Sequence, residues 1–170
     1  MQRQTSPGSE LKADKMPGHW LLARMGKRVL RPGGIELTRQ MIDALGIESS
    51  DHVVEFAPGL GATARLTLQE RPASYTGVER DATAAGIVAK HLHGDVQRCI
   101  VGRAEETGLP DACATVVYGE AMLTMQPPET KARIVREAFR LLRPGGRYGI
   151  HELSLVPPDL AESTKQEIGA

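Results

Sequence analysis

The sequence predicts an α/β fold in which an open, mainly parallel sheet is covered by helices on both faces. Short apolar runs rich in β-branched residues, such as "HVVEFA" at 52–57, are typical of buried strands. Longer segments with apolar residues at helical spacing alternate with these runs. Because parallel strands are joined by crossovers, this alternation indicates right-handed strand–helix–strand units.

Glycine and proline residues mark the ends of the expected elements. Strands are expected at 52–57, 74–80, 98–102, 113–119 and 147–155, and helices at 18–30, 35–46, 63–71, 81–94 and 127–142. Gly46 suits a C-terminal cap, and Asp81 suits an N-cap. Two "RPGG" stretches, at 31–34 and 143–146, are expected to end the helices that precede them.

The composition excludes several classes of protein. The chain has 170 residues, which fits one domain, and its formal net charge is zero. One Trp, three Tyr and two Phe give little stacking surface, so no nucleic-acid partner is expected. The two cysteines lack CxxC spacing, so no metal site is expected. No apolar run approaches about 18 residues and the first ten residues are polar, so we expect no membrane span and a cytoplasmic location.

The candidate binding residues lie at the ends of the predicted strands, where open parallel sheets bind their ligands. Gly59 and Gly61 form a turn that lets the backbone approach a ligand closely. Glu79 ends the second strand, 18 residues after Gly61, where an acid accepts hydrogen bonds from ribose hydroxyls. No Gly-Lys-Ser/Thr follows the turn, which excludes a P-loop. Glu55 would repel a pyrophosphate, so it favours a ligand that carries a cationic group.

Four segments resemble motifs of the class I S-adenosylmethionine-dependent methyltransferases, of the type 11 or type 25 kind and its small-molecule branch. "VVEFAPGLG" is similar to the first motif, and "GVERD" is similar to the second. "VGRAEETGLPDACATVVYGEAML" resembles the run from the third to the fourth strand, and "EAFRLLRPGGRYGIHEL" resembles the last block. The resemblance covers residues 35–155 and implies a Rossmann-like sheet with S-adenosyl-L-methionine as the cofactor.

The strand-end positions, together with the resemblance, give the candidate site residues. His151, toward the carboxyl end of the fifth strand, is the candidate catalytic base. The residues implied in cofactor binding are Glu55, Ala57, Pro58, Gly59, Gly61, Glu79, Arg80, Ala104, Glu105, Gly119 and Glu120.

The chain departs from the family pattern at three places. Ala57 stands where the family most often has a glycine, so we expect its backbone to keep a negative φ. Arg103 replaces the aspartate that commonly contacts adenine, which shifts that contact to Ala104 and Glu105. The family's sheet normally ends with two further strands, one of them antiparallel, and this chain stops before them. We therefore expect an exposed edge on the fifth strand and, through it, a possible homodimer.

These observations predict a methyltransferase that acts on a small molecule by direct in-line methyl transfer. The expected organisation is a flexible tail at 1–10, a helical lid at 11–46, a cofactor-binding core at 47–155 and the start of a truncated or partner-completed segment at 156–170. Two alternatives stay open, a non-catalytic cofactor-binding or assembly module and an NAD(P)-dependent oxidoreductase.

Overall fold

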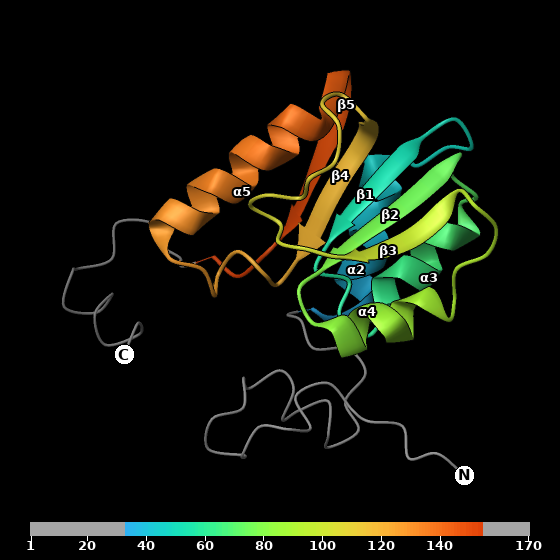
Figure 1. Cartoon of the computed structure of the whole chain (residues 1–170), viewed down its shortest axis with the longest axis horizontal. Helices are drawn as coiled ribbons and strands as arrows, with labels where there is room; N and C mark the ends of the chain where they lie inside the picture. Colours follow the sequence, from blue (N-terminus) through green and yellow to red (C-terminus); the bar gives the residue numbers. More distant parts are fainter. Residues whose placement is uncertain (1–32, 155–170) are drawn as a thin grey trace, which may run out of the picture.

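A five-stranded, all-parallel sheet forms the centre of the molecule (Figure 1). The computed structural model describes residues 33–154, and the expected helix at 18–30 lies outside them. In chain order the elements are α2 (Gly34–Leu45), β1 (His52–Phe56), α3 (Ala62–Gln69), β2 (Ser74–Glu79), α4 (Ala82–Ala89), β3 (Gln97–Val101), β4 (Ala114–Glu120), α5 (Pro128–Leu141) and β5 (Leu142–His151). The α/β prediction is confirmed, strand by strand.

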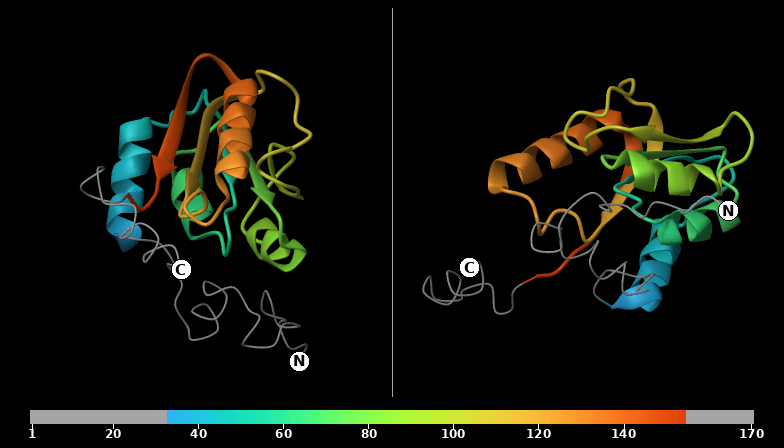
Figure 2. Two further views of the ribbon diagram at one scale, coloured as in Figure 1. Left: turned by 90° about the vertical axis from the view of Figure 1, so that its left-hand side faces the viewer. Right: turned by 60° about the horizontal axis from the view of Figure 1, so that its bottom comes forward.

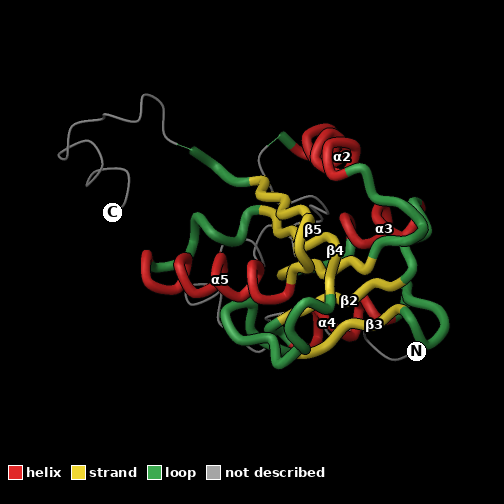
Figure 3. Tube along the Cα trace, turned by 90° about the horizontal axis from the view of Figure 1, so that it is seen from above, coloured by secondary structure: helices red, strands yellow, loops and turns green. Residues whose placement is uncertain are grey.

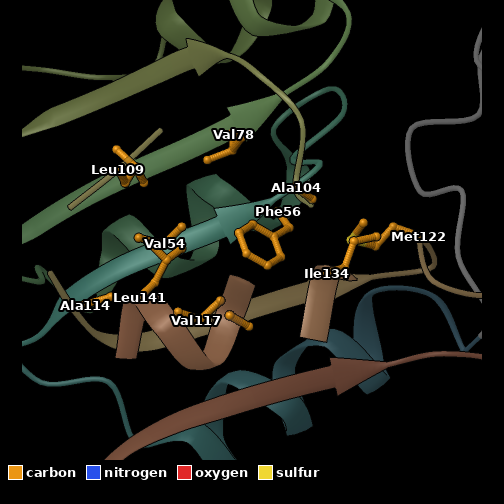
Figure 4. Packing of buried hydrophobic residues seen from close by; sticks show 11 residues of the cluster. Val54, Phe56, Val78, Ala104, Leu109, Ala114, Val117, Met122, Ile134 and Leu141 are labelled. Carbon is orange, nitrogen blue, oxygen red and sulfur yellow. The ribbon is translucent and has the colours of Figure 1, made fainter. Parts of the chain in front are cut away.

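Two apolar clusters, one on each face of the sheet, hold the helices in place. On one face Ile134, Ala138 and Leu141 of α5 pack against strand side chains that include Phe56 and Val117 (Figure 4). On the other face α2, α3 and α4 contribute side chains to a second cluster, which includes the buried Tyr75 and Tyr118; Figure 3 shows α2 and α3 on the opposite side of the sheet from α5. Both faces of the sheet are therefore covered, which explains the nearly continuous burial along β1 and β4.

The strand order, β3-β2-β1-β4-β5, places the reversal of winding between β1 and β4. The chain moves outward from β1 to β2 and β3, then crosses back to β4 and β5. The loops after β1 and β4 consequently diverge at the carboxyl edge of the sheet and leave a crevice between them. This topology predicts the ligand site at that edge.

The second "RPGG" stretch belongs to β5, which begins five residues earlier than the sequence predicted, at Leu142 instead of Arg147. α5 ends at Leu141, one residue before its expected end, and β5 follows it without a separate loop. The register against β4 shifts between Ala114 and Val116, so the early part of β5 is irregular. Pro144 is tolerated there because β5 lies at the edge of the sheet that the described strands form.

The helix caps follow the local sequence. Gly46 adopts φ 53° and ends α2, and the Asp81 side chain accepts a 2.8 Å hydrogen bond from the Ala84 N–H at the start of α4. α4 ends at Ala89, so it is shorter than expected. α2 packs beside β5, on the face away from α5 (Figure 2). Within residues 33–154, no helix has the length and apolar character needed to cross a bilayer.

Candidate functional site

A cavity of about 350 Å³ lies at the carboxyl edge of the sheet. Its walls come from the loops that follow β1, β2, β3 and β4, together with Ile134 of α5 and the residues after β5. The predicted residues that line it are Glu55, Ala57, Pro58, Gly59, Glu79, Arg80, Ala104, Glu105 and Glu120. Gly61, Gly119 and His151 are not part of its lining. The cavity is large enough for a small organic ligand.

The glycine loop after β1 is fastened to β2 by Glu79. One oxygen of the Glu79 carboxylate accepts a 2.9 Å hydrogen bond from the Gly59 N–H, and the other accepts from the Asp81 N–H at 3.0 Å. Gly61 adopts φ 75° as the residue before α3, and a Cβ there would lie 3.4 Å from the Val88 side chain. Glu79 therefore shapes the loop and also presents a carboxylate to the cavity.

Ala57 corrects one expectation, because its φ is +52° and not negative. Its N–H donates a 2.9 Å hydrogen bond to the Val78 carbonyl, which extends the pairing of β1 with β2 by one residue. The chain must turn sharply directly after this bond to enter the glycine loop. The turn requires the left-handed conformation, which costs a residue with a Cβ roughly 1–2 kcal/mol.

Two buried tyrosines hold Glu55. The hydroxyls of Tyr75 and Tyr118 donate to the same carboxylate oxygen, at 2.6 and 2.8 Å. Thr67 lies 2.7 Å from the Tyr118 hydroxyl and donates to it, since that hydroxyl's own proton is directed at Glu55. Burial, followed by the Glu55 charge, raises the pKa of both tyrosines well above 10. Both phenols therefore stay protonated and keep the carboxylate fixed at the end of β1.

Glu120, at the end of β4, gathers donors from three other elements. One oxygen accepts from Thr38 of α2 at 2.8 Å and from His151 Nδ1 of β5 at 2.6 Å. The other oxygen accepts from Thr63 of α3. Glu120 and Thr63 line the cavity, so this polar cluster connects α2 and β5 to the cavity wall.

The loop after β3 carries an ion pair at the cavity. Arg103 Nε lies 2.7 Å from a carboxylate oxygen of Glu105. Burial opposes the charged form of Glu105, but the backbone N–H and the guanidinium outweigh it and lower its pKa. Both residues line the cavity. Arg103, which stands where the family commonly has an aspartate, is thus paired with Glu105 of the same loop.

Sequence reasoning missed the wall formed by the loop after β4. Glu152 accepts hydrogen bonds from the N–H groups of Met122 and Leu123, both at 2.6 Å, and from the N–H and hydroxyl of Thr124 at 3.2 and 2.6 Å. The Met122 sulfur would lie 2.9 Å from a Cβ on Gly119, so that glycine makes room for Met122. The available signal was position, because Glu152 lies toward the carboxyl end of the predicted fifth strand, as Glu55 and Glu79 do in the first two.

The cavity wall carries more acidic than basic side chains. Among residues 33–154, its charged residues are Glu55, Glu79, Glu105, Glu120, Glu152, Arg80 and Arg103. Five carboxylates against two guanidiniums favour a cationic ligand over a pyrophosphate. Among the residues that the structure describes, no group of three or more potential ligands could hold a metal ion.

The residues from 54 to 150 match the model of a family described as a methyltransferase domain. An uncharacterized protein of Haemophilus influenzae is 36% identical over 146 residues, which are 84% of this chain and 58% of that protein. Erythromycin 3''-O-methyltransferase of Saccharopolyspora erythraea is 28% identical over 148 residues, 85% of this chain and 47% of that protein. The chain therefore spans about half the length of these two relatives.

Two further proteins are similar to this chain, one over a short segment and one over most of its length. Ribosomal RNA small subunit methyltransferase A of Mycobacterium avium is 40% identical over 67 residues, 37% of this chain and 21% of that protein. A solved structure of phosphoethanolamine N-methyltransferase 2 from Haemonchus contortus, in complex with phosphomonomethylethanolamine and S-adenosylhomocysteine, superimposes with a TM-score of 0.69 at 18% identity. That match covers 89% of this chain and 36% of that chain, and it concerns the fold alone.

The family match spans more than half of the chain. The order of the five parallel strands places the glycine loop, which follows β1, at the crevice between β1 and β4. The chain belongs to the methyltransferase domain family and has the Rossmann-like fold of the class I S-adenosylmethionine-dependent methyltransferases.

Proposed function

We propose that the chain binds S-adenosyl-L-methionine in the cavity at the carboxyl edge of the sheet and transfers its methyl group to a small molecule. The observation that carries the proposal is the pair of buried acids, Glu55 and Glu79, which flank a glycine loop in a predominantly acidic cavity. A sulfonium and an ammonium group suit this wall. The cofactor supplies an activated methyl group, so the protein's task is to bind, align and exclude water.

Each part of the cavity has a proposed role toward the cofactor. Glu79 accepts hydrogen bonds from the ribose hydroxyls with lone pairs beyond those used for Gly59 and Asp81. Glu55 faces the ammonium group. Its two tyrosines hold the carboxylate in place by neutral hydrogen bonds, so its negative charge remains for the ammonium group. Ala104 and Glu105 border the adenine, beside the apolar wall formed by Val78 and Ile134.

A small-molecule acceptor is favoured by the zero net charge, which supplies no general attraction for nucleic acid. The relative that methylates at a 3''-oxygen supports it too, because its similarity spans 85% of this chain, whereas the ribosomal RNA methyltransferase matches over only 37%. An NAD(P)-dependent oxidoreductase is disfavoured by the acidic cavity, since a pyrophosphate would meet more carboxylates than guanidiniums.

Titration calorimetry with S-adenosylhomocysteine tests cofactor binding. We expect binding by the wild type, and a loss of about 1–3 kcal/mol of binding free energy in Glu79→Ala and in Glu55→Gln. Glu106→Gln is the matched control, because this acid neighbours Glu105 in the chain but its side chain is 80% exposed and outside the cavity wall. Absence of heat with S-adenosylhomocysteine, or tighter binding of NADH, would contradict the proposal.

Transfer itself is tested by following S-adenosylhomocysteine formation from S-adenosylmethionine. The acceptors are a panel of small hydroxylated and aminated metabolites, with ribosomal RNA as a separate arm. Turnover with a member of the panel supports the proposal, and turnover with RNA alone contradicts the small-molecule part. Cofactor binding without turnover in either arm favours the non-catalytic binding module.

We further propose that two copies of the chain associate through β5. Among residues 33–154 this strand is paired on one side only, by β4, and exposed apolar side chains lie near it: Phe139 is 81%, Ile150 51% and Leu153 63% exposed. An unpaired edge next to apolar surface favours pairing with a second copy. Light scattering should show a dimer that Ile150→Lys weakens, and a monomer at every concentration would contradict the proposal.

A further inference from the structure

The side chain of His151 combines a fixed orientation with an unused nitrogen. Nδ1 lies 2.6 Å from Glu120 Oε1, and the His151 side chain is only 9% exposed. Within the described part of the chain, Nε2 is buried and has no hydrogen-bond partner. A buried polar atom without a partner costs about 1–3 kcal/mol, and such an atom often marks a place for a ligand or a functional proton.

The position of the ring is at the ligand-binding edge of the sheet. Glu120 and His151 face each other in the pairing of β4 with β5, at the carboxyl ends of both strands. The cavity is lined by the residues that follow them, which are Ala121 after β4 and Glu152 and Leu153 after β5. His151 itself lies one hydrogen bond behind the cavity wall, through Glu120.

Glu120 is poorly placed to accept a proton, although it lines the cavity. Thr38, Thr63 and His151 all direct donors at its two oxygens. The carboxylate therefore serves as a fixed acceptor, which selects the ring tautomer with the proton on Nδ1 and stabilises an imidazolium if one forms. The lone pair of the neutral ring is then left on Nε2.

We propose that His151 is the general base of the transfer, that Glu120 is its positioning residue, and that the methyl acceptor is a hydroxyl group. This inference rests on the proposed function. A hydroxyl is a weak nucleophile that must lose its proton as the new bond forms, so a neighbouring base accelerates its reaction. An amine in its neutral form attacks without such help.

Proton transfer to His151 accompanies the methyl transfer. A lone pair of the acceptor oxygen forms the bond to the methyl carbon while the bond from that carbon to sulfur breaks and leaves its electrons on sulfur. The hydroxyl proton passes to Nε2 of His151, and the imidazolium pairs with Glu120 until the proton leaves to solvent. This step requires the acceptor oxygen to reach Nε2, on the side of the ring away from Glu120.

The tautomer of His151 provides a test that needs no acceptor. In ¹⁵N-histidine-labelled protein at a pH where the ring is neutral, NMR should place the proton on Nδ1 and leave Nε2 bare. Glu120→Gln should reduce this tautomer preference at least tenfold, and His151→Asn assigns the signal. A neutral ring with its proton on Nε2 in the wild type would overturn the proposal.

The second test uses paired acceptors that differ only in carrying a hydroxyl or an amino group at the same position. We expect the hydroxyl members to be methylated, and His151→Asn to slow this by about 10²–10⁴-fold while S-adenosylhomocysteine affinity stays within about twofold. His91→Asn, outside the cavity lining, is the matched control. Transfer to the amino members alone, or full activity of His151→Asn, would overturn the inference. A wild type that fails to bind S-adenosylhomocysteine would instead overturn the proposed function.

Discussion

The hydroxyl of Tyr118 on β4 donates a 2.8 Å hydrogen bond to the carboxylate of Glu55 on β1, and these two residues face each other across the strand pair where the winding of the sheet reverses. Tyr75 donates to the same oxygen from β2 on the other side. Three central strands are therefore joined through one buried acid.

Removing either hydroxyl should destabilise the fold. Tyr75→Phe and Tyr118→Phe each leave a buried carboxylate short of one donor, and we expect each to lower the free energy of unfolding by about 1.5–3 kcal/mol in urea denaturation. Tyr148→Phe is the control, because the described structure shows no hydrogen bond to that hydroxyl, and it should cost less. Equal effects at all three positions would show that lost packing, and not the acid, sets the cost.

The acid sensitivity of the fold should include a contribution from Glu137. Its carboxylate binds Arg140 and accepts hydrogen bonds from the N–H and hydroxyl of Thr107, and the Arg140 hydrogen bond is the main cause that lowers its pKa from 4.5 to about 2. A depressed pKa in the folded state adds stability above pH 4.5, and this contribution is lost as the pH falls toward about 2.

Glu137→Gln should therefore lower the free energy of unfolding by about 2–3 kcal/mol at neutral pH. The difference between wild type and variant should shrink as the pH falls from 4.5 to about 2. Glu106→Gln, whose side chain is 80% exposed, should show little effect at any pH. A difference in unfolding free energy that stayed constant across this pH range would show that Glu137 does not stabilise the fold through its charge.

The left-handed conformation of Ala57 predicts an unusual response to glycine. Ala57→Gly removes a strained methyl group and should raise the free energy of unfolding by about 0.5–1 kcal/mol, after the entropy cost of glycine. Ala132→Gly, in the exposed interior of α5, should lower it by about 1 kcal/mol. If both substitutions destabilise the protein equally in thermal unfolding, the backbone at Ala57 is not strained.

The loop after β4 should depend on Glu152 for its order. Glu152→Gln weakens the bonds to the N–H groups of Met122 and Leu123, so we expect hydrogen exchange at these amides to accelerate by about tenfold or more. Mass spectrometry of exchange over 121–126 measures this, with exposed Glu70→Gln as the control. Unchanged protection in Glu152→Gln would mean that the neighbouring packing alone orders the loop.

Local patterns were sufficient to predict the sheet and the residues of the first two strand ends. Glu55, Gly59 and Glu79 lie in the cavity because a parallel sheet brings its carboxyl ends to one edge. The glycine loop and Asp81 follow from turn and cap chemistry, which acts within a few residues.

Features that depend on distant partners were beyond the sequence patterns. Nothing near Ala57 indicates a positive φ, because the Val78 carbonyl that fixes its N–H belongs to another strand. The early start of β5 depends on the pairing of Leu142 with Ala114 on β4, although Gly145 within "RPGG" still adopts φ 81°. Gly119 was expected at the ligand, but its lack of a side chain accommodates Met122, which is a packing constraint that no motif shows.

The cluster around Glu120 also bears on how the chain folds. Its donors lie 82, 57 and 31 residues away in the sequence, on Thr38, Thr63 and His151. Each contact closes a long loop, whose entropy must be lost before the hydrogen bond forms. Local helices and the early strand pairs can form without this cluster, whereas the cluster needs α2, α3, β4 and β5 together. We therefore expect this part of the cavity wall to form late in folding, after the elements that carry its four residues have come together.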